Sequence, residues 1–307
     1  MKVLFLNSAI TNCGVYQYGY RLANILKKSK HMTFEYKEVS CYDDYLNILQ
    51  KNSYDVIFYN YHILPLYWLN ENTIIRTQQN IGILHDCPSS FFDKVISPDP
   101  DESINNFFGV PRPLLEEFSN DKSDNQDFEN FLDINEEGVP IFGSFGFGLL
   151  NKGFHRMIEI INNQYEKAII KLLITRGHYV EYHHTIDALN ACNQVQRKDG
   201  IQLFIYETFI DDNSLMRFLS SNTMNIFLYD TMHGRGISSC IDFALSAKKP
   251  IGISDSNMFK NIYNDSICVY KNNIEVCMKN SIPHCQELIK KYSHENLINR
   301  FEEIINL

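Results

Sequence analysis

The sequence has no long hydrophobic run, no closely spaced cysteine pair and no excess of basic residues. No apolar stretch approaches the roughly 18 residues that suggest a membrane span, so any membrane contact is expected to be peripheral, at the inner face. The eight cysteines contain no CxxC pair, which favours reduced thiols in a cytoplasmic protein. A net charge of -9 disfavours nucleic acid as a partner, because duplex binding depends on clustered Lys and Arg.

Several short motifs of known chemistry are also missing. The chain has no GxSxG and no HExxH, and its glycine spacing fits neither the Walker loop nor the dinucleotide fingerprint. Asp99 and Asp101 form a DxD pattern, but the proline-rich setting indicates a surface turn. The histidines between 178 and 184 have no Cys or acidic partner at zinc-ligand spacing. We therefore expect no metal and no bound cofactor.

What the sequence does contain is a repeated alternation of short apolar runs and helical patterns. This alternation is typical of a parallel sheet covered by helices on both faces. It predicts an α/β protein with two Rossmann-like domains. The expected strands are 2–7, 34–39, 55–60, 80–85 and 94–97 in the first domain, and 140–145, 169–175, 202–206, 224–229 and 251–254 in the second.

A polar, acidic stretch from 119 to 138 is the expected connection between the domains. The domains are then residues 1–120 and 139–283, followed by a helical tail, 284–307, that packs back across the molecule. Ligands of such sheets bind beyond the carboxyl ends of the strands. The expected site is therefore a cleft between the two domains.

The segment IFGSFGFGLLNKG, residues 141–153, has the strongest functional pattern. A buried strand ends in glycines, among them Gly146, which allow a ligand to approach the backbone closely. Lys152 and Gly153 then begin a helix, whose free N–H groups favour a diphosphate. Lys152 would add a point charge. The alternative interpretation is a glycine-rich hinge followed by a solvated lysine.

A second segment, residues 227–254, has a strand, a loop and then the start of a helix. Its helix start offers hydroxyl and N–H groups to an anion, and a nearby guanidinium could hold a phosphate through its fork of donors. An ordinary capped helix is the alternative. The candidate residues are Arg235, Gly236, Ile237, Ser238 and Ser239.

Three residues of the first domain are further candidates. Gly14 precedes a helix expected to begin near Tyr16, so the N–H groups there could face a ligand; the alternative is a plain turn glycine. His85 and Asp86 end the buried strand IGILHD, where side chains project beyond the sheet. The alternative for His85 is a strand-end histidine whose hydrogen bonds are already satisfied.

The order of these segments resembles the retaining glycosyltransferases with two Rossmann-like domains, the GT-B type, and among them the glycosyltransferase 4 group. No single segment establishes the resemblance, but together the segments cover nearly the whole chain. The segments that resemble the family are GVYQYGYRLANIL at 14–26, ILHD at 83–86, the glycine loop at 141–153, FIDDNSLMRFLSSNTMNIFLYD at 209–230 and DFALSAKKPI at 242–251.

The resemblance implies sugar transfer from a nucleotide-diphosphate sugar to a glycan, a lipid-linked acceptor or another hydroxyl, with retention and without a metal. The second domain would bind the donor, a co-substrate rather than a cofactor, and the first the acceptor. His85 would touch the donor sugar. Asp86 would orient that sugar or meet the acceptor.

The chain departs from the family pattern at its acidic motif. Counting back from Pro250, the two glutamates of the family fall on Arg235 and Phe243, with Asp242 one place off. Phe147 stands where the family commonly has an arginine. Our hypothesis is that Arg235 supplies the missing cation and that Asp242 binds a ribose hydroxyl.

Three other functions fit the same segments. Two are enzymes of the same fold: a nucleotide-sugar epimerase, and a glycosyltransferase directed at DNA bases. The third is a catalytically silent protein that binds a glycan or a nucleotide. Release of nucleoside diphosphate from a sugar nucleotide would separate the transferase from the silent protein.

Overall fold

The computed structural model describes residues 1–85, 89–104, 107–233 and 236–306. The chain forms two compact units. The first contains Met1–Leu114, Gly236, Ile237 and the chain from Lys291 onward, and the second contains Leu115–His233 and Ser238–Lys290. The domain limits expected from the sequence stay a prediction.

The first unit is built on a sheet whose described strands are parallel except for β6. Their order is β2-β1-β3-β4-β5-β7-β6. Continuous apolar runs such as VLFL in β1 form these strands because both faces of the sheet are buried. The bounds are β1 Lys2–Ser8, β2 Thr33–Val39, β3 Val56–Tyr61, β4 Gln79–Leu84, β5 Lys94–Ser97, β6 Ser103–Ile104 and β7 Phe107–Gly109.

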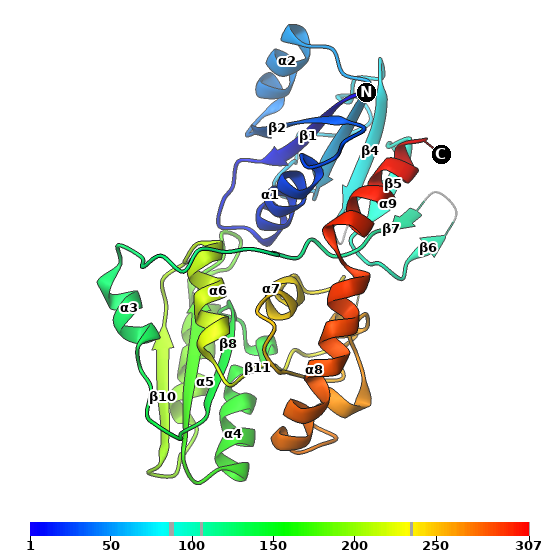
Figure 1. Cartoon of the computed structure of the whole chain (residues 1–307). Coiled ribbons are helices and arrows are strands. Elements are labelled where there is room, and N and C mark those ends of the chain that lie inside the picture. Colours follow the sequence, from blue (N-terminus) through cyan, green and yellow to red (C-terminus); the bar gives the residue numbers. More distant parts are fainter. Residues whose placement is uncertain (86–88, 105–106, 234–235, 307) are drawn as a thin grey trace. The chain divides into compact units, whose positions relative to one another are not determined.

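Three helices cover this sheet. Helices α1 (Gly14–Leu26) and α9 (His294–Asn306) pack on one face, where Leu22 and Phe301 join a core with Phe58 (Figure 1). Helix α2 (Tyr42–Lys51) packs on the other face, where Tyr45 joins Tyr59 and Trp68. The last helix of the chain therefore completes the core of the first unit.

The second unit contains a parallel sheet in the order β10-β9-β8-β11-β12. Its strands are β8 Ile141–Phe147, β9 Ala168–Thr175, β10 Ile201–Tyr206, β11 Met224–Phe227 and β12 Ile251–Ile253. Every residue of β9 is buried, as expected for a strand with neighbours on both edges and helices on both faces.

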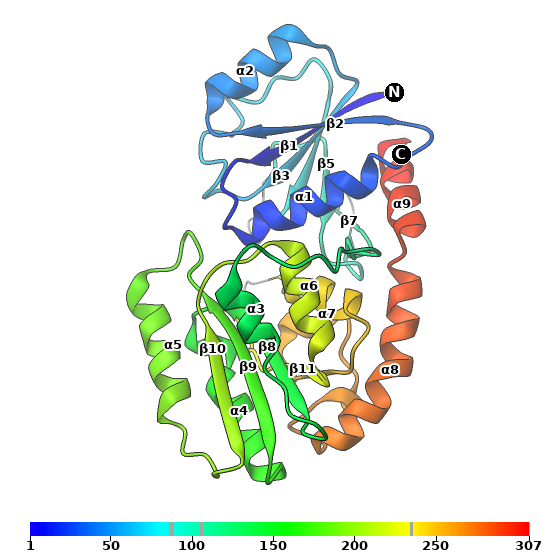
Figure 2. The same cartoon turned by 60° about the vertical axis from the view of Figure 1, so that its left-hand side comes forward.

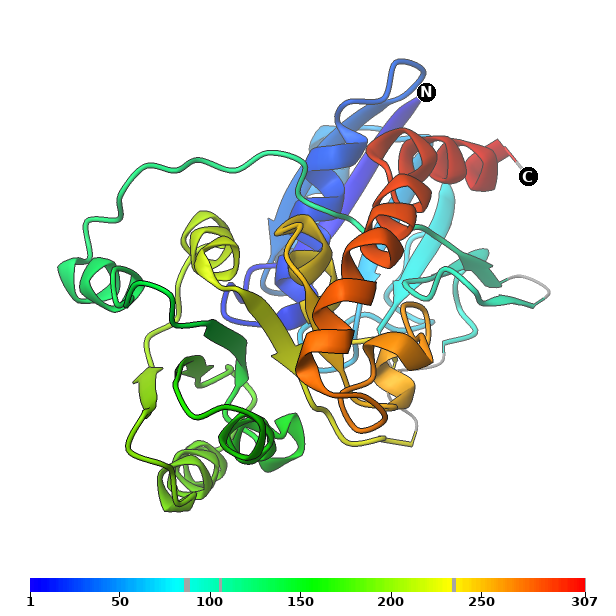
Figure 3. The same ribbon diagram turned by 60° about the horizontal axis from the view of Figure 1, so that its bottom comes forward.

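Helices lie on both faces of this second sheet (Figures 2 and 3). Helices α4 (Phe154–Gln164) and α5 (Tyr182–Gln194) share one apolar cluster with β8, β9 and β11. On the other face, Phe131 of α3 (Gln126–Leu132) stacks on Phe218 of α6 (Asp212–Ser221), and Phe243 of α7 (Cys240–Ser246) meets Phe145 of β8. Helix α8 (Ile274–Lys291) follows, with Pro283 inside it.

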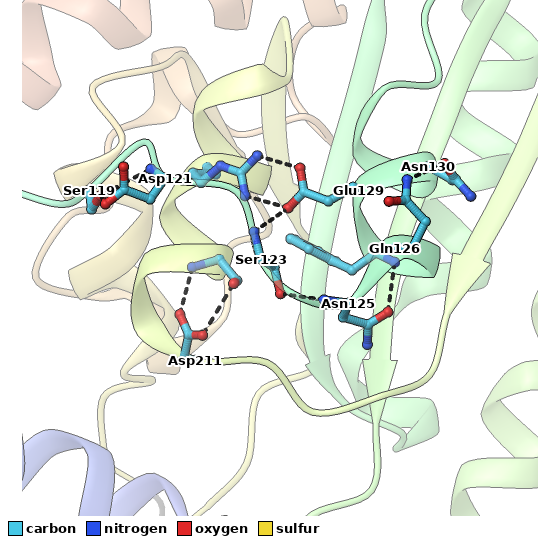
Figure 4. A network of polar contacts seen from close by, with 11 residues as sticks. Ser119, Asp121, Ser123, Asn125, Gln126, Glu129, Asn130 and Asp211 are labelled. Carbon is cyan, nitrogen blue, oxygen red and sulfur yellow. Dashed lines mark hydrogen bonds and ion pairs between the residues drawn. The ribbon is translucent and has the colours of Figure 1, made fainter.

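The acidic stretch from 119 to 138 is a structured part of the second unit. Asn125 caps α3 by accepting a hydrogen bond from the Phe128 amide at 3.1 Å. Glu129 accepts two hydrogen bonds from the Arg217 guanidinium, at 2.6 and 2.7 Å, and one from the Ser123 amide at 2.7 Å (Figure 4). The hydrogen bonds from Arg217 therefore hold this segment against α6.

The predicted fold class is confirmed: the chain is an α/β protein with two Rossmann-like sheets. The observed ends of the predicted strands lie within about two residues of those expected, which is the usual uncertainty of element boundaries. The structure adds α3, β6 and β7 to the elements expected from the sequence. Among the described residues, no helix has the length and apolar character needed to cross a membrane.

Candidate functional site

The carboxyl ends of β8 and β11 form the topological switch point of the second sheet. From β8 the chain adds β9 and β10 toward one edge, and it then returns to add β11 and β12 toward the other. The helix after β8, α4, and the helix after β11, α7, pack on opposite faces. Ligands of open α/β sheets bind at this point, beyond the carboxyl ends of the two central strands.

Two of the predicted glycines let the end of β8 and the segment after it lie against the end of β11. A Cβ atom on Gly146 would lie 3.2 Å from the Tyr229 hydroxyl. Gly153 adopts φ 65°, and a Cβ there would collide with the Leu228 carbonyl oxygen. Both a left-handed backbone and a close approach therefore require glycine at position 153.

Lys152 stacks on an aromatic ring that follows β11. It is the last residue of a short 3₁₀ helix, Leu150–Lys152, and its Nζ lies 3.7 Å from the centroid of the Tyr229 ring. An ammonium over the face of a tyrosine is attracted by the ring quadrupole. The half-buried lysine is therefore held at the carboxyl end of the central strands.

The Tyr229 side chain is buried beneath this lysine. Its hydroxyl lies in hydrogen-bonding contact with the side chains of Ser238 and Cys240, and burial raises the pKa of Tyr229 well above its ordinary value. Burial also raises the pKa of the Cys240 thiol. Both groups therefore stay neutral, and Tyr229 offers Lys152 a neutral aromatic face.

A second basic residue, Arg156, belongs to the same end of the sheet. Its Nη1 lies 2.6 Å from the Asp230 carboxylate, and its Nη2 donates to the Leu228 carbonyl oxygen at 2.5 Å. Arg156 thus ties the first turn of α4 to the chain that leaves β11. This pair was not predicted from the sequence; the only signal was a basic residue three positions after Gly153 and an acid directly after Tyr229.

The second predicted segment is arranged differently from the expectation. Helix α7 begins at Cys240, so Gly236 and Ile237 precede the helix and only Ser239 occupies its N-cap. The Ser238 amide donates to the Met258 carbonyl at 3.1 Å, and Asp242 is fully buried. Ser238 is brought beside Tyr229, as described above. Arg235 lies outside the described residues.

In the first unit, Gly14 is the first residue of α1, whereas the helix was expected to begin near Tyr16. His85 directly follows β4, and its amide continues the sheet by donating to the Tyr61 carbonyl at 3.0 Å. The neighbouring candidate, Asp86, lies outside the described residues.

His85 is held in a setting that keeps it neutral. Burial, together with the positive charge of Arg112 and the proximity of His62, lowers the pKa of His85 to about 3. The His85 ring meets the Tyr18 ring edge to face at 4.9 Å, and its Nε2 lies 2.7 Å from the Asn60 Oδ1. Tyr18 and Asn60 were not predicted from the sequence; a polar residue near the end of the apolar β3 was the only signal.

Within the described part of the chain, no three side chains of His, Cys, Asp or Glu gather as metal ligands would. The described charged groups that follow β8 and β11 include Lys152 and the pair formed by Arg156 and Asp230.

Comparison with solved structures identifies the fold. HepE from Anabaena, in complex with UDP-glucose, matches 100% of this chain and 99% of its own with a TM-score of 0.67 at 10% identity. A glycosyltransferase from Rickettsia africae matches 99% and 97% with a TM-score of 0.62 at 12% identity. An alpha-glucosyltransferase, AGT, in complex with UDP, matches 100% and 99% with a TM-score of 0.60 at 10% identity.

The chain has the fold of the GT-B glycosyltransferases. No protein-family model matches the sequence, and no curated protein matches it. At identities near 10% the likeness establishes the fold, while function has to be argued from the site. Membership of the glycosyltransferase 4 group and the roles of the candidate residues stay predictions.

Proposed function

We propose that this protein is a glycosyltransferase that moves a sugar from a nucleotide-diphosphate donor to a hydroxyl of a glycan or lipid-linked acceptor. The observation that carries the proposal is Lys152, stacked on Tyr229 at the switch point of the second sheet. Structures with the same fold hold UDP-glucose or UDP, which supports a uridine nucleotide as the first donor to test.

The proposed role of Lys152 follows from the charge that sugar transfer creates. The acceptor oxygen bonds to the anomeric carbon while the bond from that carbon to the phosphate oxygen breaks, so negative charge grows on the leaving diphosphate. The hydroxyl proton leaves the acceptor oxygen in the same step and passes to the released diphosphate or to water. A positioned ammonium stabilises this charge more in the transition state than in the bound donor. Tyr229 contributes by holding the ammonium in place before the donor arrives.

Further parts of the proposal concern the course of the reaction and the other candidate residues. We propose retention of the anomeric configuration without a metal, with Gly146, Gly153 and Ser239 near the diphosphate. Arg235 and Asp242 remain proposed donor contacts, and His85 and Asp86 proposed contacts of the reacting sugar. A cytoplasmic location is supported by the free thiols of the described cysteines.

The experiment is calorimetry of the full chain with UDP and with UDP-, GDP-, ADP- and CMP-sugars. Lys152→Met should weaken binding of the preferred nucleoside diphosphate about 10-fold, the loss expected when a charged hydrogen bond is removed. Lys167→Met is the matched control, because Lys167 is exposed, pairs with Glu136 and directly precedes β9, at the amino ends of the strands of the same sheet. Equal affinity of the Lys152→Met variant and the wild type would overturn the proposal.

Turnover separates the proposed function from the other candidates. A transferase should slowly release nucleoside diphosphate from its donor in the absence of acceptor, and the anomeric configuration of its product can be measured by NMR. Activity should survive treatment with EDTA. Tight donor binding without any release would support the silent binding protein, and isomerisation of the bound sugar would support an epimerase.

A further inference from the structure

Three polar side chains follow one another along the carboxyl ends of neighbouring strands in the first unit. Asn7 lies in β1, Asn60 in β3 and His85 directly after β4. Both asparagines have 0% exposure, which is unusual for this residue type and requires that their amide groups be hydrogen-bonded. The β1 and β3 strands are also the switch point of this sheet.

The surrounding groups fix which way each amide points. The Asn7 Oδ1 accepts from the Ser8 amide at 3.0 Å, while its Nδ2 donates to the Tyr16 carbonyl at 3.0 Å. The Asn60 Nδ2 donates to the Asn7 Oδ1 at 2.8 Å and to the Val15 carbonyl at 2.7 Å. A flipped Asn60 would place its oxygen against two acceptors, so only the observed orientation satisfies the network.

Helix α1 supplies part of this network because it comes unusually close to the two strands. The carbonyls that accept from the asparagines belong to its first turn, at Val15 and Tyr16. A Cβ atom on Gly19 would collide with the Asn60 amide. Glycine at position 19 therefore permits the approach that fixes both asparagines.

The orientation of Asn60 determines the tautomer of His85. The Asn60 Oδ1 faces the His85 Nε2 at 2.7 Å and can only accept. A neutral imidazole must then carry its proton on Nε2, which leaves Nδ1 as an acceptor. Within the described residues, Nδ1 has no hydrogen-bond partner, and the side chain is partly exposed.

We propose that Asn60, oriented by Asn7, is a positioning residue that holds His85 as the Nε2–H tautomer, so that Nδ1 accepts a hydrogen bond from a sugar hydroxyl. The ligand part of this proposal rests on the proposed function. Among the described residues, the groups that face His85 are Tyr18, His62 and Arg112, besides Asn60. The arrangement selects ligands with a hydroxyl at one position and gives the imidazole no role as a general acid.

The first test measures the tautomer directly in the wild-type protein. Long-range ¹H–¹⁵N NMR at pH 7, with the His85 signals identified by their loss in His85→Gln, should show Nε2 protonated and Nδ1 unprotonated. A protonated Nδ1, or an equal mixture of the two tautomers, would overturn the proposal. This test needs no ligand and therefore holds even if the proposed function fails.

The second test removes the positioning residue. Asn60→Ala should give a mixture of His85 tautomers, whereas Asn80→Ala, the matched control, should leave the tautomer unchanged. Asn80 is another fully buried asparagine of the first unit, but it bonds to Tyr59 and to the Ile75 carbonyl. An unchanged tautomer in a folded Asn60→Ala variant would exclude the positioning role.

The third test links the network to the sugar. Among donors that each lack one hydroxyl, one should bind the wild type about 3- to 10-fold more weakly than the parent donor, the range of a single neutral hydrogen bond. Asn60→Ala should lose this discrimination and keep the wild-type affinity for the nucleoside diphosphate alone. Discrimination that survives in Asn60→Ala would contradict the ligand part, while failure of every nucleotide to bind would refute the proposed function instead.

Discussion

Lys152 and Tyr229 come from segments after two different strands, β8 and β11, and meet as an ammonium over an aromatic ring. The contact makes the lysine part of the packed structure of the second unit. The Tyr229 hydroxyl is itself in hydrogen-bonding contact with Ser238 and Cys240, so the ring that the ammonium contacts is held in place. The consequences of this contact can be measured separately from those of the lysine charge.

We predict that Tyr229→Leu weakens binding of the preferred nucleoside diphosphate about 3- to 10-fold, because the lysine loses an interaction of about 1 kcal/mol and becomes less ordered. Tyr229→Phe keeps the ring, so its affinity for the nucleoside diphosphate should lie within about twofold of the wild type. Because the variant lacks the hydroxyl contacts, its free energy of unfolding should fall by about 1 kcal/mol. Calorimetry and urea unfolding measure the two quantities. Equal binding by the Leu variant would show that the ring does not position Lys152.

The loop after β8 provides a second prediction, about backbone geometry. Gly153→Ala should lower the free energy of unfolding by more than about 2 kcal/mol. The added Cβ would collide with the Leu228 carbonyl oxygen. The left-handed backbone would cost about 1 kcal/mol in addition. Gly138→Ala is the control: its φ is 75°, but a Cβ there meets nothing within 4 Å. Urea unfolding should find the Gly138 variant about 1 kcal/mol less stable. Equal losses would mean that the Leu228 contact is unimportant.

The sequence predicted the two sheets well because local patterns encode them. Buried parallel strands appear as continuous apolar runs, so β9 was expected at 169–175 and occupies Ala168–Thr175. Helix α3 was missed because its seven residues lie in an acidic stretch. What stabilises it comes from far along the chain: Arg217 binds Glu129 across 88 residues.

The candidate site residues also differ in whether local sequence patterns predicted them. Glycine and lysine spacing after β8 pointed to Gly146, Lys152 and Gly153, and the structure brings these to one end of β8. The contact of Lys152 with the Tyr229 ring was not predictable, because in the sequence Tyr229 has the pattern of an ordinary core aromatic residue. Asn60 gave a weak signal as a polar residue near the end of an apolar strand, but its orientation depends on three-dimensional contacts with α1.

The ion pair of α3 gives a prediction about acid stability. Hydrogen bonds from Arg217 lower the pKa of Glu129 to about 2. The folded state therefore gains stability from this carboxylate above the unfolded value near 4.3, and loses it as the pH falls toward 2. Glu129→Gln should be about 2 kcal/mol less stable than the wild type at pH 7, because it leaves a mostly buried guanidinium without its carboxylate.

Urea unfolding as a function of pH measures this effect. The difference between wild type and Glu129→Gln should shrink between pH 4.5 and pH 2. Glu136→Gln is the control, because Glu136 forms an exposed pair with Lys167. Its substitution should change the free energy of unfolding by less than about 0.5 kcal/mol. A difference that stays constant down to pH 2 would contradict the assignment of the acid sensitivity to Glu129.

Lys171 gives the last prediction, at alkaline pH. It lies fully buried in β9, where its ammonium donates to the Leu132 carbonyl at 2.7 Å and burial lowers its pKa to about 8. In the unfolded chain a lysine titrates near 10.4, so between pH 8 and 10.4 the unfolded state binds more protons than the folded state. Raising the pH through this window therefore stabilises the fold.

The free energy of unfolding of Lys171→Met should lie within about 1 kcal/mol of the wild-type value at pH 7, because an apolar side chain of similar length avoids burying a charge. Comparing urea unfolding of the two proteins from pH 7 to 10 cancels the titrations that they share. The wild type should gain stability relative to the Met variant above pH 8. Lys171→Arg, which stays charged, should be less stable than both and show no such gain. A constant difference between wild type and Lys171→Met would mean that Lys171 keeps an ordinary pKa, and that its bond to α3 balances the penalty of its burial.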